Sequence, residues 1–62
     1  MPHVQITMLK GRTLEQKRKL AARITDALEQ ECGAKREAIS LAIVEVTKED
    51  FASAGTLVVD KK

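Results

Sequence analysis

A proline at position 2 follows a methionine and opens the first apolar segment of the chain. Methionine is normally trimmed when proline comes next, and we expect trimming to leave Pro2 with a free secondary amine. An amine of this kind can accept a proton near neutral pH. Pro2 is therefore a candidate general base, while the simpler interpretation is that it only opens a strand.

Arg12 and Phe51 are two further side chains with clear chemical potential. Arg12 follows Gly11, and a guanidinium stays protonated and can bind a carboxylate through two parallel hydrogen bonds. The alternative for Arg12 is a solvated turn position. Phe51 is the one aromatic residue of the chain, and it can form either the dry wall of a site or part of the core.

Histidine and cysteine occur once each, at His3 and Cys32. A single cysteine cannot form an internal disulfide, and a single histidine cannot build an all-histidine metal site within one chain. We expect His3 to lie on the strand face opposite Pro2, with a structural or interface role. Cys32 falls on the apolar side of a predicted helix and is expected to be an inert core thiol.

Three regular segments are predicted to position these residues. Residues 2–9 alternate between apolar and polar side chains, which predicts a half-buried strand. Residues 14–32 place their apolar side chains on one stripe of a helix. A capping box of Thr13 and Gln16 is expected to begin this helix, and Gly33 is expected to end it.

The charges of the predicted helix run against its macrodipole. Its basic residues come early, and its acidic residues Asp26, Glu29 and Glu31 come late. Contacts with another subunit are one explanation for this order.

Residues 39–46 are apolar at both odd and even positions, which is typical of a strand buried on both faces. Two strands joined by a helix form a βαβ unit, whose strands run parallel with a right-handed crossover. One helix covers only one face of a two-stranded sheet, so the other face is expected to meet another subunit. Residues 34–38 form a short polar connector, and residues 56–59 are expected to form a hairpin edge strand.

The sequence thus predicts an α/β fold with one domain over residues 1–62. This domain is a single βαβ unit with parallel strands and a short C-terminal hairpin, assembled as an oligomer. So short a chain buries only about 60% of the surface that its unfolded form exposes, and oligomerisation is the expected source of further stability.

Composition narrows the class of partner and the compartment. With one aromatic residue and a net charge of +2, no nucleic-acid partner is expected. No apolar run approaches the length of a membrane span, and no signal-peptide core is found at the N-terminus, so no membrane partner is expected. The unpaired cysteine suits a reducing compartment, and we therefore expect a cytoplasmic protein.

The segment Leu9-Lys10-Gly11-Arg12-Thr13, followed by Glu15-Gln16-Lys17, lies at a distance from Pro2 that resembles the 4-oxalocrotonate tautomerase family. Phe51, with Gly55 after it, sits where that family has an aromatic active-site residue. The resemblance spans essentially the whole chain. It implies βαβ subunits assembled as a homohexamer, a trimer of dimers. It also implies cofactor-free isomerases that move protons on small enol and keto acids in the catabolism of aromatic compounds.

The resemblance further implies roles for three residues. Pro2 would be the general base that moves a proton from the 2-hydroxyl of a dienol acid to a distant carbon. Arg12 would bind the substrate carboxylate. Phe51 would supply a dry wall, and a dry pocket with an arginine nearby disfavours the protonated form of the Pro2 amine.

Ser40 departs from the family, because the best-known members have an arginine at this position of the second strand. Ser40 can donate one neutral hydrogen bond and supplies no positive charge, and losing one donor to a developing anion can cost about 10²–10³ in rate. As a substrate-binding residue, Ser40 would favour a monocarboxylate such as phenylenolpyruvate, or leave only weak activity on a dicarboxylate. Lys35 and Arg36 precede this strand and are candidates to replace the missing charge.

Two alternatives to a tautomerase remain open. A protonated Pro2 would act as a general acid, as in related hydratases and dehalogenases of haloacrylic acids, although these need more than one arginine. The second alternative is an oligomeric small-ligand-binding module that is weakly active or inactive. Retention of Met1 would favour this module, because an acylated Pro2 is an amide with no basic lone pair.

Overall fold

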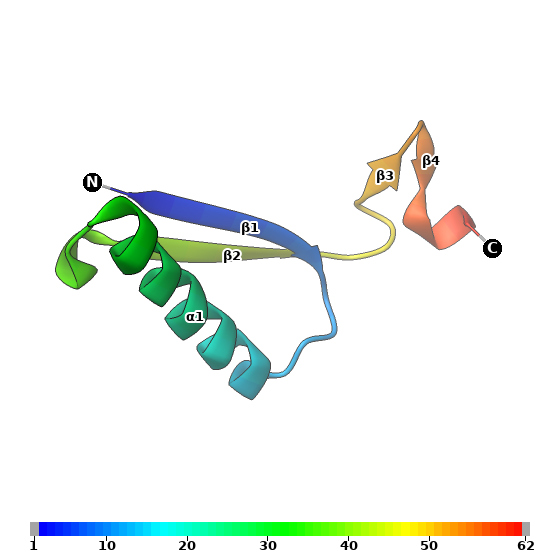
Figure 1. Ribbon diagram of the computed structural model, residues 1–62. Coiled ribbons are helices and arrows are strands. Elements are labelled where there is room, and N and C mark those ends of the chain that lie inside the picture. The colour runs from blue at the N-terminus through cyan, green and yellow to red at the C-terminus, as the bar shows by residue number, and fades with distance from the viewer. Residues whose placement is uncertain (1, 62) are drawn as a thin grey trace.

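A parallel pair of strands with one long helix across it forms the larger part of the molecule (Figure 1). The computed structural model describes residues 2–61, and the expected removal of Met1 concerns a residue outside this range. The elements in chain order are β1 (His3–Leu9), α1 (Leu14–Cys32), the short 3-10 helix η1 (Arg36–Ala38), β2 (Ser40–Val46), β3 (Ala52–Ser53), β4 (Thr56–Leu57) and the 3-10 helix η2 (Val58–Asp60).

β1 and β2 pair in parallel, with His3 opposite Ser40 at one end and Leu9 opposite Val46 at the other. The parallel βαβ unit predicted from the sequence is therefore confirmed. Each strand begins one residue later than predicted. Pro2 still takes part in the pairing, because the Ser40 amide donates a hydrogen bond of 3.1 Å to the Pro2 carbonyl.

The ends of α1 follow from local capping chemistry, as predicted. The Thr13 amide donates to Gln16 Oε1 over 2.9 Å, and the Gln16 amide donates to Thr13 Oγ1 over 3.1 Å. These two bonds satisfy two amides that the first turn of a helix leaves free. At the other end Gly33 takes a left-handed conformation, with φ 67°, and its amide donates to the Glu29 carbonyl.

α1 covers one face of the sheet, and the other face stays open. Val4, Ile6 and Met8 of β1 are half-buried against the helix side, while the residues between them are exposed. On the same side, Lys17 Nζ of α1 donates to Glu45 Oε1 of β2 over 2.6 Å. The open face carries apolar side chains such as Val44, which is 40% exposed.

The amount of exposed surface indicates that the chain does not complete its own core. None of the side chains in residues 2–61 is fully buried. The accessible surface is 4913 Å², whereas a compact monomer of 6.8 kDa exposes about 3,950 Å². The excess is of the size that one partner contributes to a stable protein–protein interface. An oligomer is therefore the form in which the apolar face is covered.

The C-terminal hairpin extends away from the βαβ unit (Figure 1). Its turn residues Ala54 and Gly55 both have positive φ, 53° and 80°, as a tight turn between right-twisted strands requires. The radius of gyration of 14.7 Å exceeds the value of about 11 Å for a compact chain of this length. The predicted edge strand over residues 56–59 is too long, because η2 begins at Val58.

The expectation of a core thiol is wrong for this chain. Cys32 is exposed as the last residue of α1. A two-layer unit has no third layer to cover the end of its helix, so a position on the apolar stripe is not sufficient for burial. No helix in the described range, residues 2–61, is both long and apolar enough to cross a membrane.

Candidate functional site

The four predicted site residues lie at two ends of the sheet. Pro2 and Ser40 are at the end where β1 and β2 begin, while Arg12 and Phe51 follow the end where the two strands finish (Figure 1). The seven residues of β1 separate these ends by about 20 Å at the usual rise of a strand. One chain therefore brings Pro2 together with Ser40, and it does not bring either of them to Arg12.

The end that contains Pro2 also holds a side-chain pair that sequence reasoning missed. His3 Nδ1 and Ser40 Oγ are 2.7 Å apart, and both residues are exposed. They meet because they are the first residues of paired parallel strands. The strand register was the information needed, since a helix and 37 positions separate them along the chain.

Arg12 lines a cavity of about 200 Å³ at the opposite end of the sheet, with walls from β1 and α1. Gly11, with φ 135°, turns the chain out of β1 and gives Arg12 its place before the helix. The other polar side chains of the wall are already engaged, Gln16 with Thr13 and Lys17 with Glu45. The remaining lining residues are Met8 and Leu20.

Arg12 is the cation of this cavity that is left without an anion. The ion pairs among residues 2–61 engage other basic side chains and leave Arg12 unpaired. A guanidinium with free donors beside apolar walls can bind a carboxylate through two parallel hydrogen bonds. The arrangement suits a small organic acid with an apolar body.

Phe51 is 41% exposed on the segment that leads into the hairpin. Its carbonyl accepts a hydrogen bond of 2.8 Å from the Val58 amide, which closes the base of the hairpin. Phe51 does not belong to a core within this chain, and it does not face Pro2 of the same chain.

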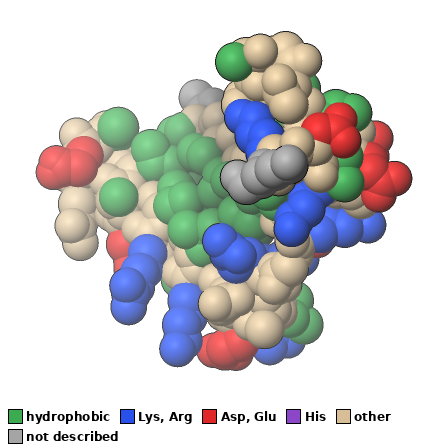
Figure 2. Space-filling view, turned by 90° about the vertical axis from the view of Figure 1, so that its right-hand side faces the viewer, with side chains coloured by type: hydrophobic (Ala, Val, Ile, Leu, Met, Phe, Trp, Pro, Cys, Tyr) green, Lys and Arg blue, Asp and Glu red, His purple; other side chains and the backbone are tan. Residues whose placement is uncertain are grey.

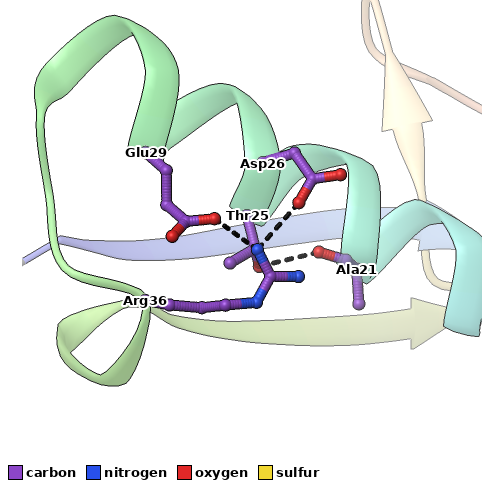
Figure 3. A network of polar contacts seen from close by, with 5 residues as sticks. All are labelled: Ala21, Thr25, Asp26, Glu29 and Arg36. Atoms are coloured by element: carbon purple, nitrogen blue, oxygen red, sulfur yellow. Dashed lines mark hydrogen bonds and ion pairs between the residues drawn. The ribbon is translucent and has the colours of Figure 1, made fainter.

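Arg36 does not replace the missing arginine of the second strand. Its Nη1 donates to Asp26 Oδ1 over 2.7 Å and also to Glu29, so η1 is joined to the acidic end of α1 (Figure 3). The hydrogen bonds to Asp26 and then Glu29 raise the pKa of Arg36 above its ordinary value. Arg36 thus compensates Asp26 and Glu29, two of the late acidic residues of α1, within the chain and without another subunit. Lys35 is exposed before η1.

Charge and apolar surface lie next to each other on the face of the molecule that Figure 2 shows. A continuous area of hydrophobic side chains borders several Lys and Arg side chains there (Figure 2). Among residues 2–61, no three His, Cys, Asp or Glu side chains gather as ligands for a metal ion.

Known proteins are similar to this chain in sequence and in fold. The model of the tautomerase enzyme family matches residues 2–61. The 2-hydroxymuconate tautomerase of Bacillus subtilis (strain 168) is 46% identical over 55 residues, which cover 89% of each chain. The crystal structure of YwhB, a homologue of 4-oxalocrotonate tautomerase, matches 98% of this chain and 100% of its own, with a TM-score of 0.94 and 41% identity.

A heterohexameric 4-oxalocrotonate tautomerase from Chloroflexus aurantiacus J-10-fl matches over 100% of both chains, with a TM-score of 0.92 and 29% identity. The resemblance inferred from Pro2, the Gly11-Arg12-Thr13 turn and Phe51 is confirmed at the level of the family. This chain belongs to the tautomerase enzyme family.

Proposed function

We propose that this chain is a cofactor-free keto–enol tautomerase of small 2-hydroxy-dienoate or enol-pyruvate acids. The observation that carries the proposal is the Arg12 cavity, where a cation without a partner in the described part of the chain adjoins apolar walls. The 46% identity to a 2-hydroxymuconate tautomerase supports the same substrate class. An organic acid with a short apolar chain is the ligand that such a cavity fits.

In this proposal Pro2 is the general base. Once Met1 is removed, the secondary amine takes the proton of the substrate's 2-hydroxyl and returns a proton to a distant carbon. The O–H bond and one C=C double bond are lost while a C–H bond and the C2 carbonyl form, so the reaction balances without a cofactor. Arg12 holds the carboxylate, and Phe51 excludes water from the amine, which favours its neutral form.

The separation of Pro2 from Arg12 makes the proposed site one between copies of the chain. Two copies whose β1 strands run in opposite directions would place Pro2 and Ser40 of one copy at the Arg12 and Phe51 end of the other. The open face of the sheet would then pack against further copies, in a homohexamer built as a trimer of dimers. The heterohexameric neighbour supports an assembly of six chains.

Ser40 sets the substrate preference in this proposal. Its side chain carries no charge beside Pro2, at a position where a second arginine would bind a second carboxylate. We therefore propose a monocarboxylate such as phenylenolpyruvate as the better substrate, with weaker turnover of dicarboxylates. The cytoplasm and the catabolism of aromatic compounds are the proposed setting.

The proposal is tested by turnover of phenylenolpyruvate and 2-hydroxymuconate, after intact-mass spectrometry has shown whether Met1 is present. Pro2→Ala is expected to lower kcat/KM by about 10²–10⁴, the usual contribution of a positioned proton acceptor. The control is an unchanged oligomer size and circular dichroism spectrum. Equal rates for both proteins would exclude Pro2 as the base. Saturable binding of these acids without turnover would instead favour a ligand-binding module, and turnover of 3-haloacrylic acids alone would favour a dehalogenase.

A further inference from the structure

The pair formed by His3 and Ser40 lies directly beside Pro2 on both strands. His3 follows Pro2 in the chain, and the Ser40 amide donates to the Pro2 carbonyl over 3.1 Å. The two side chains join across the sheet, with 2.7 Å between His3 Nδ1 and Ser40 Oγ. Two polar side chains are therefore fixed next to the residue proposed as the base.

The direction of the hydrogen bond with Ser40 decides which nitrogen of the neutral His3 ring carries the hydrogen, and the distance of 2.7 Å admits both directions. In a neutral imidazole one nitrogen carries hydrogen and the other accepts. A serine hydroxyl that donates to Nδ1 leaves the hydrogen on Nε2. Within residues 2–61 the ring makes its hydrogen bond through Nδ1, and with the hydroxyl as donor the Nε2–H would be left for a ligand.

His3 and the Pro2 ring lie on opposite faces of β1, but the reacting atom of Pro2 belongs to the strand backbone. His3 is exposed and the Pro2 ring is half-buried, as alternation along a strand requires. The basic atom of Pro2 is its backbone nitrogen, which lies in the strand between the two faces. For a ligand atom at this nitrogen to meet His3, the copies that pack on the open face must leave its end beside Pro2 uncovered.

We propose that His3, oriented by Ser40, donates its Nε2–H to the C2 oxygen from which Pro2 removes the proton. The inference rests on the proposed function and names the residue that stabilises charge in the same site. As the proton leaves, the C2 oxygen gains negative charge, and a donor directed at that charge lowers the barrier. His3 takes this role where the second strand supplies a serine in place of an arginine, and Ser40 acts as a positioning residue.

Steady-state kinetics test the assignment. His3→Ala is expected to lower kcat for phenylenolpyruvate about 5- to 10-fold with KM nearly unchanged, as the loss of one neutral hydrogen bond predicts. His3→Gln, whose amide nitrogen lies where Nε2 lies, should recover part of this loss, while His3→Asn should not. Ser40→Ala should lower kcat less than His3→Ala does. Combining Ser40→Ala with His3→Ala should lower kcat no further than His3→Ala alone. Thr7→Ala, exposed on the same face of β1, is the matched control.

A second measurement does not depend on turnover. The chain has one histidine, so the ring nitrogen resonances belong to His3 without ambiguity. Nitrogen NMR should show the Nε2–H tautomer in the wild type and a loss of that preference in Ser40→Ala. Pyruvate, which has a C2 oxygen, should shift these resonances saturably, and acetate, which lacks it, should not. No response to pyruvate, or an equal response to acetate, overturns the inference.

The outcomes separate this inference from the proposed function. A Pro2→Ala protein as active as the wild type overturns both. A Pro2→Ala protein that is inactive, together with wild-type kinetics for His3→Ala, overturns the role of His3 alone. A His3→Ala protein with a changed oligomer size and an unchanged kcat assigns the pair to a subunit interface, and it overturns the inference as well.

Discussion

The two ends of the β1–β2 sheet differ in charge and in how far their polar groups are engaged. At the beginning of the strands, Ser40 forms hydrogen bonds with both Pro2 and His3, and none of these three residues is a lysine, arginine, aspartate or glutamate. At the other end Arg12 is an unpaired cation in a cavity, and Phe51 is exposed on a segment that leaves the βαβ unit. Under the proposed function, this difference means that each chain supplies two unlike half-sites, which two copies must join.

Mixing two inactive variants is the strongest way to test this pairing of unlike ends. Pro2→Ala lacks one half-site, and Arg12→Ala lacks the other. When the two proteins are unfolded together and reassembled, random mixing should restore about a quarter of the wild-type activity, because that share of sites receives both intact halves.

The control mixes Pro2→Ala with a Pro2→Ala, Arg12→Ala double variant, which should remain inactive. A failure of the first mixture to recover activity, with mixed oligomers shown by native mass spectrometry, would place Pro2 and Arg12 of one chain in the same site. That result would contradict the separation of the two ends along β1.

A charge placed at the neutral end should change substrate preference. Ser40→Arg is expected to raise kcat/KM for 2-hydroxymuconate relative to phenylenolpyruvate by about tenfold, because a charged hydrogen bond to the second carboxylate becomes possible. Ser40→Gln is the matched control, with a long neutral side chain. A ratio that is the same in both variants would mean that position 40 does not contact the second carboxylate.

The smallest expected effect concerns stability at the cationic end. Lys17 and Glu45 pair over 2.6 Å with both side chains 26% exposed, and the pair holds α1 against β2 beside the Arg12 cavity. A double-mutant cycle of Lys17→Met and Glu45→Gln should give a coupling of about 0.5–1 kcal/mol in the free energy of unfolding at low salt. The exposed Glu15–Arg18 pair, at 3.5 Å, should give close to zero. Equal coupling energies would mean that the half-buried Lys17–Glu45 pair stabilises the fold no more than the exposed Glu15–Arg18 pair does.

Features that depend on neighbouring residues could be predicted from the sequence. The bounds of α1 follow from Thr13, Gln16 and Gly33, whose hydrogen bonds are all local. The hairpin was harder to predict from the sequence. Ala54 adopts a positive φ, which is unusual for alanine, and η2 begins where an edge strand was expected.

Features that depend on register or on strand length were harder to predict. The pairing of His3 with Ser40 requires the alignment of β1 with β2, which the apolar pattern leaves undetermined. The distance from Pro2 to Arg12 could have been predicted, because a strand over residues 2–9 must separate the two residues. The roles assigned to Pro2, Arg12, Phe51 and Ser40 stay predictions.

Every side chain in residues 2–61 keeps some contact with solvent, and this has a consequence for the protein at low abundance. When most of the stabilising burial comes from other copies, folding and association become one equilibrium. Dilution then acts as a denaturant does, and the thermal midpoint rises with total protein. A cell that makes few copies would hold a larger share of unassembled chains, which proteases can remove. Abundance would thus set a threshold below which the half-sites never meet.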